Sequence, residues 1–241
     1  MAKQRIDSLL VTKGLAESRA KAQALIMAGE VMAAGKVVVK SGTLVNDEAE
    51  VTLLESSPFV GRGGIKLAYA LEQFQIDVSG KVVVDVGAST GGFTDCLLQR
   101  GASRVYAVDV GYGQLDYRLR RDSRVVVMER VNARYPVSLP ERVDLATIDL
   151  SFISVRKVLP SVVELLRDDG YLVVLIKPQF EARREEGGKG GVIKEPLMHA
   201  IILGRLIAWM VGHGFRLKGL VVSPILGSSG NQEFFVLLKL T

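Results

Sequence analysis

The spacing of apolar residues in the first part of the chain predicts two short helices followed by a small sheet. A first helix, ending near Gly14, is predicted from apolar positions at helical spacing, namely Ile6, Leu9, Leu10 and Leu15. Ser18 as N-cap and Gly29 as C-cap predict a second helix over Arg19–Ala28. Short β-like runs follow at Val31–Ala33, Lys36–Val39 and Val51–Leu54. Residues 1–56 are therefore predicted to form a small α+β binding module, too small to hold an active site of its own.

Residues 57–64 have the Ser, Pro and Gly composition of a linker, and beyond them the pattern changes. Apolar strand-like runs recur at Val82–Val86, Arg104–Val108, Val125–Met128, Leu145–Ile148, Tyr171–Ile176, Leu217–Val222 and Phe234–Leu238. Helical segments lie between most of them, among them Gly92–Arg100, Val155–Leu166 and Pro196–Val211. Strands that alternate with helices predict an α/β domain over residues 65–241, with a mostly parallel, doubly wound sheet of seven strands.

Composition narrows the class of protein. One cysteine and two histidines among 241 residues supply neither a disulfide framework nor a metal-ligand cluster, so no metal is expected. The longest apolar stretch, Leu197–Gly212, contains His199 and Arg205 and is shorter than the ~20 residues of a membrane span, so we expect a core-facing helix. No secretory signal is visible at the N-terminus. These features predict a cytoplasmic protein with no membrane partner.

The net charge of +5 is compatible with a polyanionic partner, although a merely basic surface would give the same total. Residues 1–40 carry seven basic and three acidic residues, whereas residues 41–60 carry four acidic residues and no basic one. This distribution predicts that the small unit docks RNA with a single face. The candidates for RNA binding are Arg5, Ser18, Arg19, Lys21, Lys40 and Arg62. Further phosphate contacts could come from Arg118, Arg120, Arg121 and Arg124, with solvated surface charge as the alternative for each.

The strongest local signal is a run in which an apolar strand leads into a glycine-rich turn and then a helix. Ligands bind outside the carboxyl ends of parallel strands, where small residues let them approach the backbone. Three residues separate Gly87 from Gly91, which is not the dinucleotide spacing, and Asp85 before the turn suits a cationic group better than a pyrophosphate. Asp109 ends the next strand, where it can bind ribose hydroxyls. We predict a nucleotide-type cofactor site formed by Asp85, Gly87, Ala88, Ser89, Thr90, Gly91, Gly92, Phe93 and Asp109, the alternative being glycines that serve only a tight turn.

Four further charged residues stand at strand ends or beside the linker. Asp149 and Lys177 each follow a buried strand and share the sheet edge of the glycine turn. A lysine directly after four apolar residues is costly to bury without a partner. Lys66 follows the glycine-rich linker, and Glu233 opens the last strand. Each alone could be a solvated charge, but together they suggest a second set of chemical groups.

Motifs spread through almost the whole chain resemble the TlyA family of ribosomal-RNA ribose methyltransferases, whose members often carry a legacy haemolysin label. The motifs are the segments 61–67, 85–95, 110–115, 149–154, 177–181 and 230–234. The resemblance implies a Rossmann-like class I methyltransferase domain of the FtsJ-like type, with an antiparallel last strand and S-adenosyl-L-methionine as cofactor. It also implies that the N-terminal unit is similar to the αL-type RNA-binding domain of a small-subunit ribosomal protein, the S-four type.

By motif matching, the Lys-Asp-Lys-Glu tetrad of FtsJ-like enzymes falls on Lys66, Asp149, Lys177 and Glu233, and Asn132 and Asp149 complete the cofactor-binding candidates. A ribose 2′-hydroxyl is a poor nucleophile, so its proton must leave as it attacks a methyl group on sulfonium. Lys177 is expected to accept or stabilise that proton, while Glu233 holds Lys66 or the ribose. Lys66 would favour the neutral form of Lys177 and Asp149 the charged form, and the sequence leaves open which prevails.

Three functions are weighed at this point. The resemblance favours 2′-O-methylation of ribosomal RNA, on the large subunit, because short family members without a C-terminal extension are associated with that subunit. The alternatives are a haemolysin-like membrane-active protein and a non-catalytic RNA-binding ribosome-assembly factor. The segment Leu197–Gly212 is a poor membrane-surface helix, and the intact glycine turn and tetrad argue against the assembly factor. The target nucleotide, the choice between subunit and naked RNA, and the oligomeric state stay open.

Overall fold

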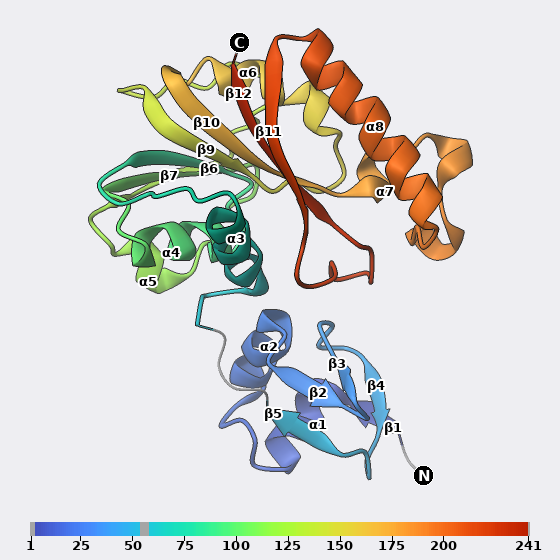
Figure 1. Ribbon diagram of the computed structural model, residues 1–241. Helices are drawn as coiled ribbons and strands as arrows, with labels where there is room; N and C mark the ends of the chain where they lie inside the picture. Colours follow the sequence, from blue (N-terminus) through green and yellow to red (C-terminus); the bar gives the residue numbers. More distant parts are fainter. Residues whose placement is uncertain (1–2, 54–57, 241) are drawn as a thin grey trace. The chain divides into compact units, whose positions relative to one another are not determined.

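A computed structural model of the chain describes residues 3–53 and 58–240 (Figure 1). The chain divides into two compact units, residues 1–65 and residues 66–241, each with a hydrophobic core of its own. The end of the predicted strand at Leu54 and the start of the predicted linker lie outside the described residues. Helix α3 spans Arg62–Gln73, so it begins inside the segment whose glycines predict a linker.

The first unit contains the two predicted helices and a sheet in two small parts. The helices are α1 (Ile6–Thr12) and α2 (Arg19–Ala28). Ser18 accepts a hydrogen bond from the Lys21 amide, and Gly29 ends α2 with a left-handed backbone, as the cap residues predict. The strands β3, β2 and β5 form one antiparallel sheet, and β1 pairs with β4. Their bounds are β1 Lys3–Arg5, β2 Val31–Ala33, β3 Lys36–Val37, β4 Leu44–Asn46 and β5 Val51–Leu53.

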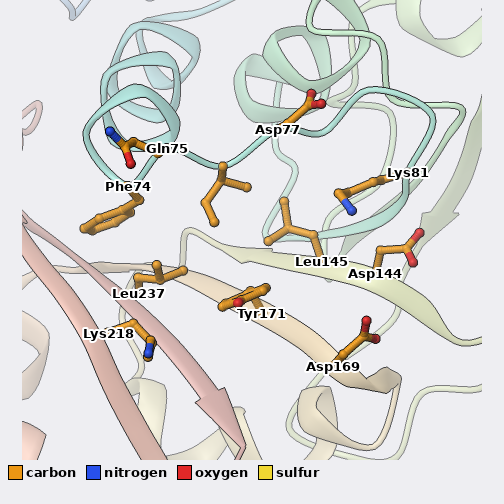
Figure 2. Close-up of a pocket in the computed structure, with 11 residues that line it drawn as sticks. Phe74, Gln75, Asp77, Lys81, Asp144, Leu145, Asp169, Tyr171, Lys218 and Leu237 are labelled. Atoms are coloured by element: carbon orange, nitrogen blue, oxygen red, sulfur yellow. The ribbon is translucent and has the colours of Figure 1, made fainter.

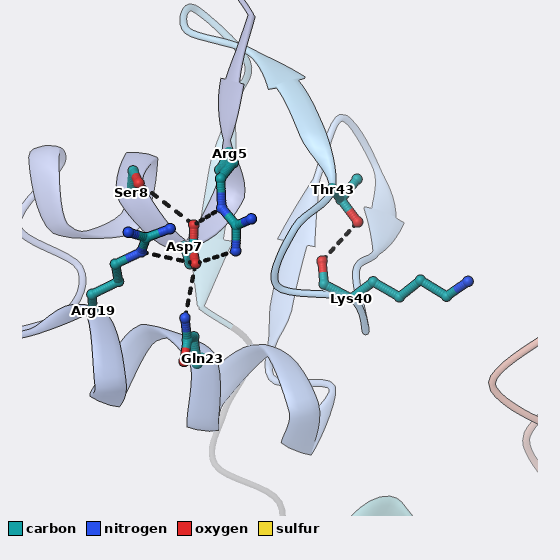
Figure 3. A network of polar contacts seen from close by, with 7 residues as sticks. All are labelled: Arg5, Asp7, Ser8, Arg19, Gln23, Lys40 and Thr43. Atoms are coloured by element: carbon teal, nitrogen blue, oxygen red, sulfur yellow. Dashed lines mark hydrogen bonds and ion pairs between the residues drawn. The ribbon is translucent and has the colours of Figure 1, made fainter.

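The fully buried carboxylate of Asp7, in α1, is hydrogen-bonded to side chains of β1 and α2 (Figure 3). Its oxygens accept hydrogen bonds from both Nε and Nη2 of Arg5, at 3.0 and 2.8 Å. They also accept from Arg19 Nε and Gln23 Nε2, each at 3.0 Å. The Arg5 guanidinium, helped by Gln23 and Arg19 and opposed by burial, holds the pKa of Asp7 well below its usual range. The two arginines that the sequence predicts as RNA ligands are therefore fixed beside each other by one acid.

Replacing Asp7 by asparagine is expected to destabilise the first unit by about 1–3 kcal/mol, because the buried side chain loses its charge-assisted hydrogen bonds to Arg5 and Arg19. The lowered pKa means that this stabilisation is complete above the unfolded value of ~3.9 and is lost as the pH falls through the folded value. Hydrogen exchange measured by mass spectrometry on peptides from residues 3–53 checks this. The control, Glu50→Gln at an exposed position, should leave exchange unchanged; equal protection in both variants would contradict the role of Asp7.

The second unit is a seven-stranded sheet in the order β11-β12-β10-β9-β6-β7-β8. Its strands are β6 (Val82–Val86), β7 (Arg104–Asp109), β8 (Val125–Glu129), β9 (Val143–Ile148), β10 (Leu166–Ile176), β11 (Phe215–Val222) and β12 (Phe234–Leu240). Strand β12 runs antiparallel to both of its neighbours, and the pairs formed by β6, β7, β8, β9 and β10 are parallel. The prediction of a doubly wound sheet with an antiparallel last strand is confirmed.

Helices cover both faces of the sheet (Figure 1), and β6, β7, β9, β10 and β12 bury consecutive side chains, which point to both faces. On one face, Leu203 and Leu206 of α8 join a core with alternate strand residues such as Val84 and Val174. On the other, Phe93 of α4 stacks on Phe235 at a ring-centroid distance of 6.1 Å. The remaining helices are α4 (Gly92–Gln99), α5 (Tyr117–Arg120), η1 (Val155–Lys157), α6 (Leu159–Val163), α7 (Pro178–Glu181), η2 (Arg184–Glu186), η3 (Lys189–Gly191) and α8 (Pro196–Gly212).

The predicted helix over Val155–Leu166 is broken into η1 and the short α6. Pro160 stands at the start of α6, and a proline inside a helix lacks the amide that the preceding turn needs. The chain has already entered β10 at Leu166, which pairs with Val143 of β9. The predicted helix Pro196–Val211, by contrast, is present as α8, with Ile202, Leu203, Leu206 and Met210 buried. This confirms that the longest apolar stretch is a core-facing helix.

Candidate active site

The sheet has a topological switch point between β6 and β9. From β6 the chain proceeds outward to β7 and β8, then crosses back to β9 and β10 on the other side. The crevice at such a point is where open α/β sheets bind ligands. A cavity of about 510 Å³ lies there. It is lined from the ends of β6, β7, β8 and β9 by Val86, Gly87, Ser89, Val108, Asp109, Val110, Gln114, Val131, Asn132, Ala133, Asp149, Leu150, Ser151, Phe152, Ile153 and Val158.

The glycine turn after β6 is held tightly against β9. Gly87 has a φ of +89°, which disfavours any side chain. A Cβ atom on Gly87 would lie 2.1 Å from the backbone oxygen of Asp149. The Gly87 amide donates to the Val108 carbonyl at 2.8 Å, and the Asp149 amide donates to that of Val86 at 3.0 Å. The turn therefore brings the ends of β6, β7 and β9 together, and Gly87 lines the cavity beside them.

Asp109 lines this cavity, and two backbone amides fix the orientation of its carboxylate. Its Oδ2 accepts from the Ser89 amide at 2.8 Å, and its Oδ1 accepts from the Gly111 amide at 2.6 Å. A carboxylate has about four acceptor positions, so two are left for ligand hydroxyls. The arrangement suits the pair of ribose hydroxyls for which the sequence predicts this residue.

Asp85 does not line the cavity. It is fully buried, and it accepts hydrogen bonds from Thr94 Oγ1 at 2.7 Å and Thr147 Oγ1 at 3.0 Å. Burial raises the pKa of Asp85 to about 7, and these two bonds oppose the rise. In the alternation of β6, Val84 and Val86 belong to one core, and Asp85 bonds to α4 on the other side. Through these bonds Asp85 joins α4, the helix after the glycine turn, to β6 and β9.

Of the other predicted cofactor ligands, Gly87, Ser89, Asn132 and Asp149 line the cavity, whereas Ala88, Thr90, Gly91, Gly92 and Phe93 do not.

The four tetrad candidates form two close ion pairs. Lys66 Nζ lies 2.5 Å from Glu233 Oε2, with both side chains almost fully buried. Lys177 Nζ lies 2.5 Å from Asp149 Oδ1 and donates to Ser151 Oγ at 3.2 Å. The register explains their proximity, because Ile176 of β10 pairs with Phe234 of β12, which sets Lys177 beside Glu233. Two cations and two anions thus meet at the sheet edge that carries the cavity.

A second cavity of about 510 Å³ lies at the opposite edge of the sheet, where β6 and β9 begin (Figure 2). Its lining includes Lys81, Asp144, Tyr171 and Lys218. Asp144 is engaged by the Val82 amide and by Arg167. None of the tetrad or glycine-turn residues belongs to this cavity. Because ligands of parallel sheets bind at the carboxyl ends of the strands, the first cavity is the better active site.

Several of the predicted RNA ligands have partners within the protein. Arg5 and Arg19 are held by Asp7, and Ser18 caps α2. Lys21 and Lys40 are exposed, and Arg62 opens α3. In and beside α5, Arg118, Arg120 and Arg124 pair with Asp116, Glu129 and Asp122, and Arg121 lies over the ring of Tyr117. Pairing lowers the net charge that these arginines present to a phosphate.

Two negative findings apply to residues 3–53 and 58–240. No helix there combines the length and the apolar character needed to cross a membrane. That part of the chain also contains no group of three His, Cys, Asp or Glu side chains that could hold a metal ion.

Sequence reasoning gave no role to two buried acids, Asp7 and Glu181. Glu181 accepts hydrogen bonds from Ser154 Oγ and from the Val155 amide. The available signal for each is an acidic residue inside or beside a hydrophobic element, where an unpaired charge would be costly. Apart from Arg5, which stands two positions before Asp7, the partners come from residues 12 to 27 positions away, so spacing alone does not reveal them.

Family models match both units. The model of the FtsJ-like methyltransferases matches residues 59–240, and that of the S4 domain matches residues 4–51. The chain is 46% identical over 239 residues to the 16S/23S rRNA (cytidine-2'-O)-methyltransferase TlyA of Mycobacterium tuberculosis, covering 98% of this chain and 89% of that protein. It is 34% identical over 195 residues to the 23S rRNA (cytidine-2'-O)-methyltransferase TlyA of Campylobacter jejuni, covering 80% and 75% respectively.

A solved structure from Streptococcus thermophilus that carries a hemolysin label is similar over the whole chain. Its sequence is 44% identical, its TM-score is 0.78, and the match covers 100% of this chain and 90% of that one.

Proposed function

The chain belongs to the FtsJ-like methyltransferase family and carries an S4 domain, and from this premise we propose that it transfers a methyl group from S-adenosyl-L-methionine to a ribose 2′-hydroxyl of large-subunit ribosomal RNA. The two ion pairs of Lys66, Asp149, Lys177 and Glu233 at the cavity edge are the observation that carries the proposal. Relatives named as rRNA (cytidine-2'-O)-methyltransferases support a cytidine of ribosomal RNA as the target.

The residues around the cavity fit S-adenosyl-L-methionine. Gly87 and Ser89 of the glycine turn line the cavity, and Asp109 has acceptor positions for ribose hydroxyls. Asn132 offers an amide to an adenine ring, and Val108 and Val131 supply apolar walls. Asp149, at the floor, favours the positive charge next to the group to be transferred. When bound, the cofactor would supply a methyl group on a positively charged sulfur.

The chain's own groups provide alignment and a proton acceptor. Lys177 Nζ is the group that would take the proton of the ribose hydroxyl, and Asp149 at 2.5 Å would stabilise the ammonium so formed. The electron pair of the broken methyl–sulfur bond would stay with the leaving sulfur. Ser151 Oγ accepts a hydrogen bond from the same amine and fixes its direction. Glu233 holds Lys66 so that the second ammonium can point at the ribose. Holding nucleophile and methyl group in line supplies much of the rate.

The proposal is tested with methyl-labelled S-adenosyl-L-methionine and ribosomal subunits from cells that lack this activity. Label is expected in the large subunit. Free large subunits, free small subunits and naked RNA are compared so that the form of the substrate is identified. Label in both subunits would widen the substrate. No label in any of them, from protein that binds the cofactor, would contradict the proposal and favour an RNA-binding assembly factor.

Asp109→Ala is expected to weaken cofactor binding by about 10–100-fold, the equivalent of losing charged hydrogen bonds to ribose hydroxyls. The physical reason is that both carboxylate oxygens are held toward the cavity by the amides of Ser89 and Gly111. Isothermal titration calorimetry with S-adenosyl-L-methionine measures the Kd. Asp122→Ala is the matched control, since Asp122 pairs with Arg124 and does not line the cavity. Equal Kd values for the two variants would remove Asp109 from the site.

A further inference from the structure

Glu181 is a buried acid that stands four residues after Lys177 in the chain. It is the last residue of α7, the short helix that directly follows Lys177. Its side chain is 9% exposed. Oε2 accepts from Ser154 Oγ at 2.6 Å, and Oε1 accepts from the Val155 amide at 2.8 Å. Both carboxylate oxygens of Glu181 therefore accept hydrogen bonds from the loop that follows β9.

The same two segments are joined a second time at the reacting groups. Asp149 begins the loop after β9, and Lys177 begins the segment after β10. Their ion pair of 2.5 Å and the bond from Lys177 to Ser151 connect these segments near the cavity. Four residues further along, Glu181 connects them again at Ser154 and Val155. Two links fix both the separation and the relative direction of the segments, which one link cannot do.

The loop between these links needs such support. Phe152 has a φ of +65°, a left-handed conformation that is strained for a residue with a side chain. Its ring is 90% exposed and lies 5.1 Å from the ring of Phe180. A strained conformation persists only when the surrounding structure holds it. Ser154 and Val155, the two partners of Glu181, follow it closely in the chain.

Burying a carboxylate costs free energy, and at this position the carboxylate accepts two hydrogen bonds from the loop after β9. Burial raises the pKa of Glu181, while the bonds from Ser154 and Val155 and the charges of Arg156 and Arg205 oppose the rise. Arg205 itself donates two hydrogen bonds to Glu186, at 2.6 and 2.7 Å. A hydrophobic residue would fill the space of Glu181 at less cost, but it would accept neither loop donor.

We propose that Glu181 is a positioning residue for methyl transfer, which holds the loop after β9 against the segment after β10 so that Asp149 and Lys177 stay aligned. The inference rests on the proposed function. Glu181 acts through Ser154 and Val155 and has no contact with the reacting atoms in this account. Its loss should therefore change the rate of the reaction more than the binding of the cofactor.

Glu181→Gln tests the proposal with little change in volume. We expect kcat to fall by about 100-fold, the cost of a misplacement of about 1 Å, while KM for S-adenosyl-L-methionine changes by less than about threefold. The matched control is Glu186→Gln, a partly buried acid of the same segment whose hydrogen bonds go to Arg183 and Arg205 and to neither strand-end loop. It should keep the wild-type kcat. Equal kcat values for Glu181→Gln and the wild type would overturn the proposal, as would an equal loss in the control.

A milder variant separates positioning from general destabilisation. Ser154→Ala removes one of the two loop donors. If both residues act through one link, the double variant Ser154→Ala/Glu181→Gln should be no slower than Glu181→Gln alone. Multiplicative losses would show that the two residues act separately and would contradict the proposal.

A crystal structure of Glu181→Gln gives a readout that needs no RNA. We expect the loop after β9 to shift and the 2.5 Å contact between Lys177 Nζ and Asp149 to open. An unchanged contact would overturn the positioning role. If the wild type methylates no RNA, the proposed function fails, but this structural comparison still decides the role of Glu181.

Discussion

Lys177→Met should lower kcat for methyl transfer by about 10²–10⁴-fold, the usual contribution of a positioned proton acceptor. Methionine keeps the length and the apolar stem of lysine but has no amine to take the ribose proton. The Asp149 carboxylate loses its partner at 2.5 Å, so the groups that would align and stabilise the proton transfer are removed together. Stopped reactions with labelled cofactor and large ribosomal subunits measure kcat directly.

Cofactor affinity should be nearly unchanged in Lys177→Met, because Lys177 does not line the cavity at the switch point. The matched control is Lys218→Met, an exposed lysine of β11 at the opposite edge of the sheet. It should methylate at the wild-type rate. A Lys177→Met enzyme with the control's kcat would show that another group takes the proton.

Glu233→Leu should destabilise the second unit by about 3–5 kcal/mol, because it leaves the Lys66 ammonium buried without its partner. The pair is an extreme case in this protein, since the side chains are 9% and 3% exposed and the charged atoms are 2.5 Å apart. Trp209, the only tryptophan of the chain, reports urea unfolding of the second unit alone. Activity should be lost as well.

A double variant distinguishes stability from chemistry at this pair. Lys66→Met/Glu233→Leu replaces both charges by apolar groups of similar size, an exchange that is often neutral or stabilising. We expect the free energy of unfolding to return close to the wild-type value while methyl transfer stays absent. Recovered activity in the double variant would mean that the pair has only a structural role.

The architecture of the second unit could be predicted because its strands are continuous apolar runs with glycines at their ends. β6 and α4 follow from the run Val82–Val86 and the turn after it, and α8 follows from a long apolar segment opened by a proline. The antiparallel direction of β12 is different. It has no signal in the chain's periodicity, and resemblance alone predicts it correctly.

The elements that the sequence did not predict have physical causes for escaping notice. Strands β1 and β4 are three residues each and pair across some forty positions, so they leave no periodic pattern. Gly63 and Gly64 suggest a linker, yet they lie in α3, where a Cβ on Gly64 would meet the Phe59 ring at 2.3 Å. Here glycine serves close packing, and composition does not distinguish that use from flexibility.

At the site, the sequence identifies which residues carry charge but not the direction in which each side chain faces. Asp85 follows the pattern expected of a ligand, yet strand alternation directs it toward Thr94 and Thr147 and away from the cavity. Asp7 is bonded to Arg19, and Glu181 to Ser154, through tertiary folding, which local spacing does not encode. The tetrad candidates come from motif matching to FtsJ-like enzymes, and the structure joins them in two ion pairs.

The chemical position of the transferred methyl group tests the central claim most directly. Large-subunit RNA treated with the protein and S-adenosyl-L-methionine is digested to nucleosides, and each methylated nucleoside is fragmented in the mass spectrometer. We predict one new product, a cytidine whose added mass stays with the ribose when the base is lost, absent after treatment with Lys177→Met. A methyl group on the base, or no methylated nucleoside from protein with bound cofactor, would contradict the account.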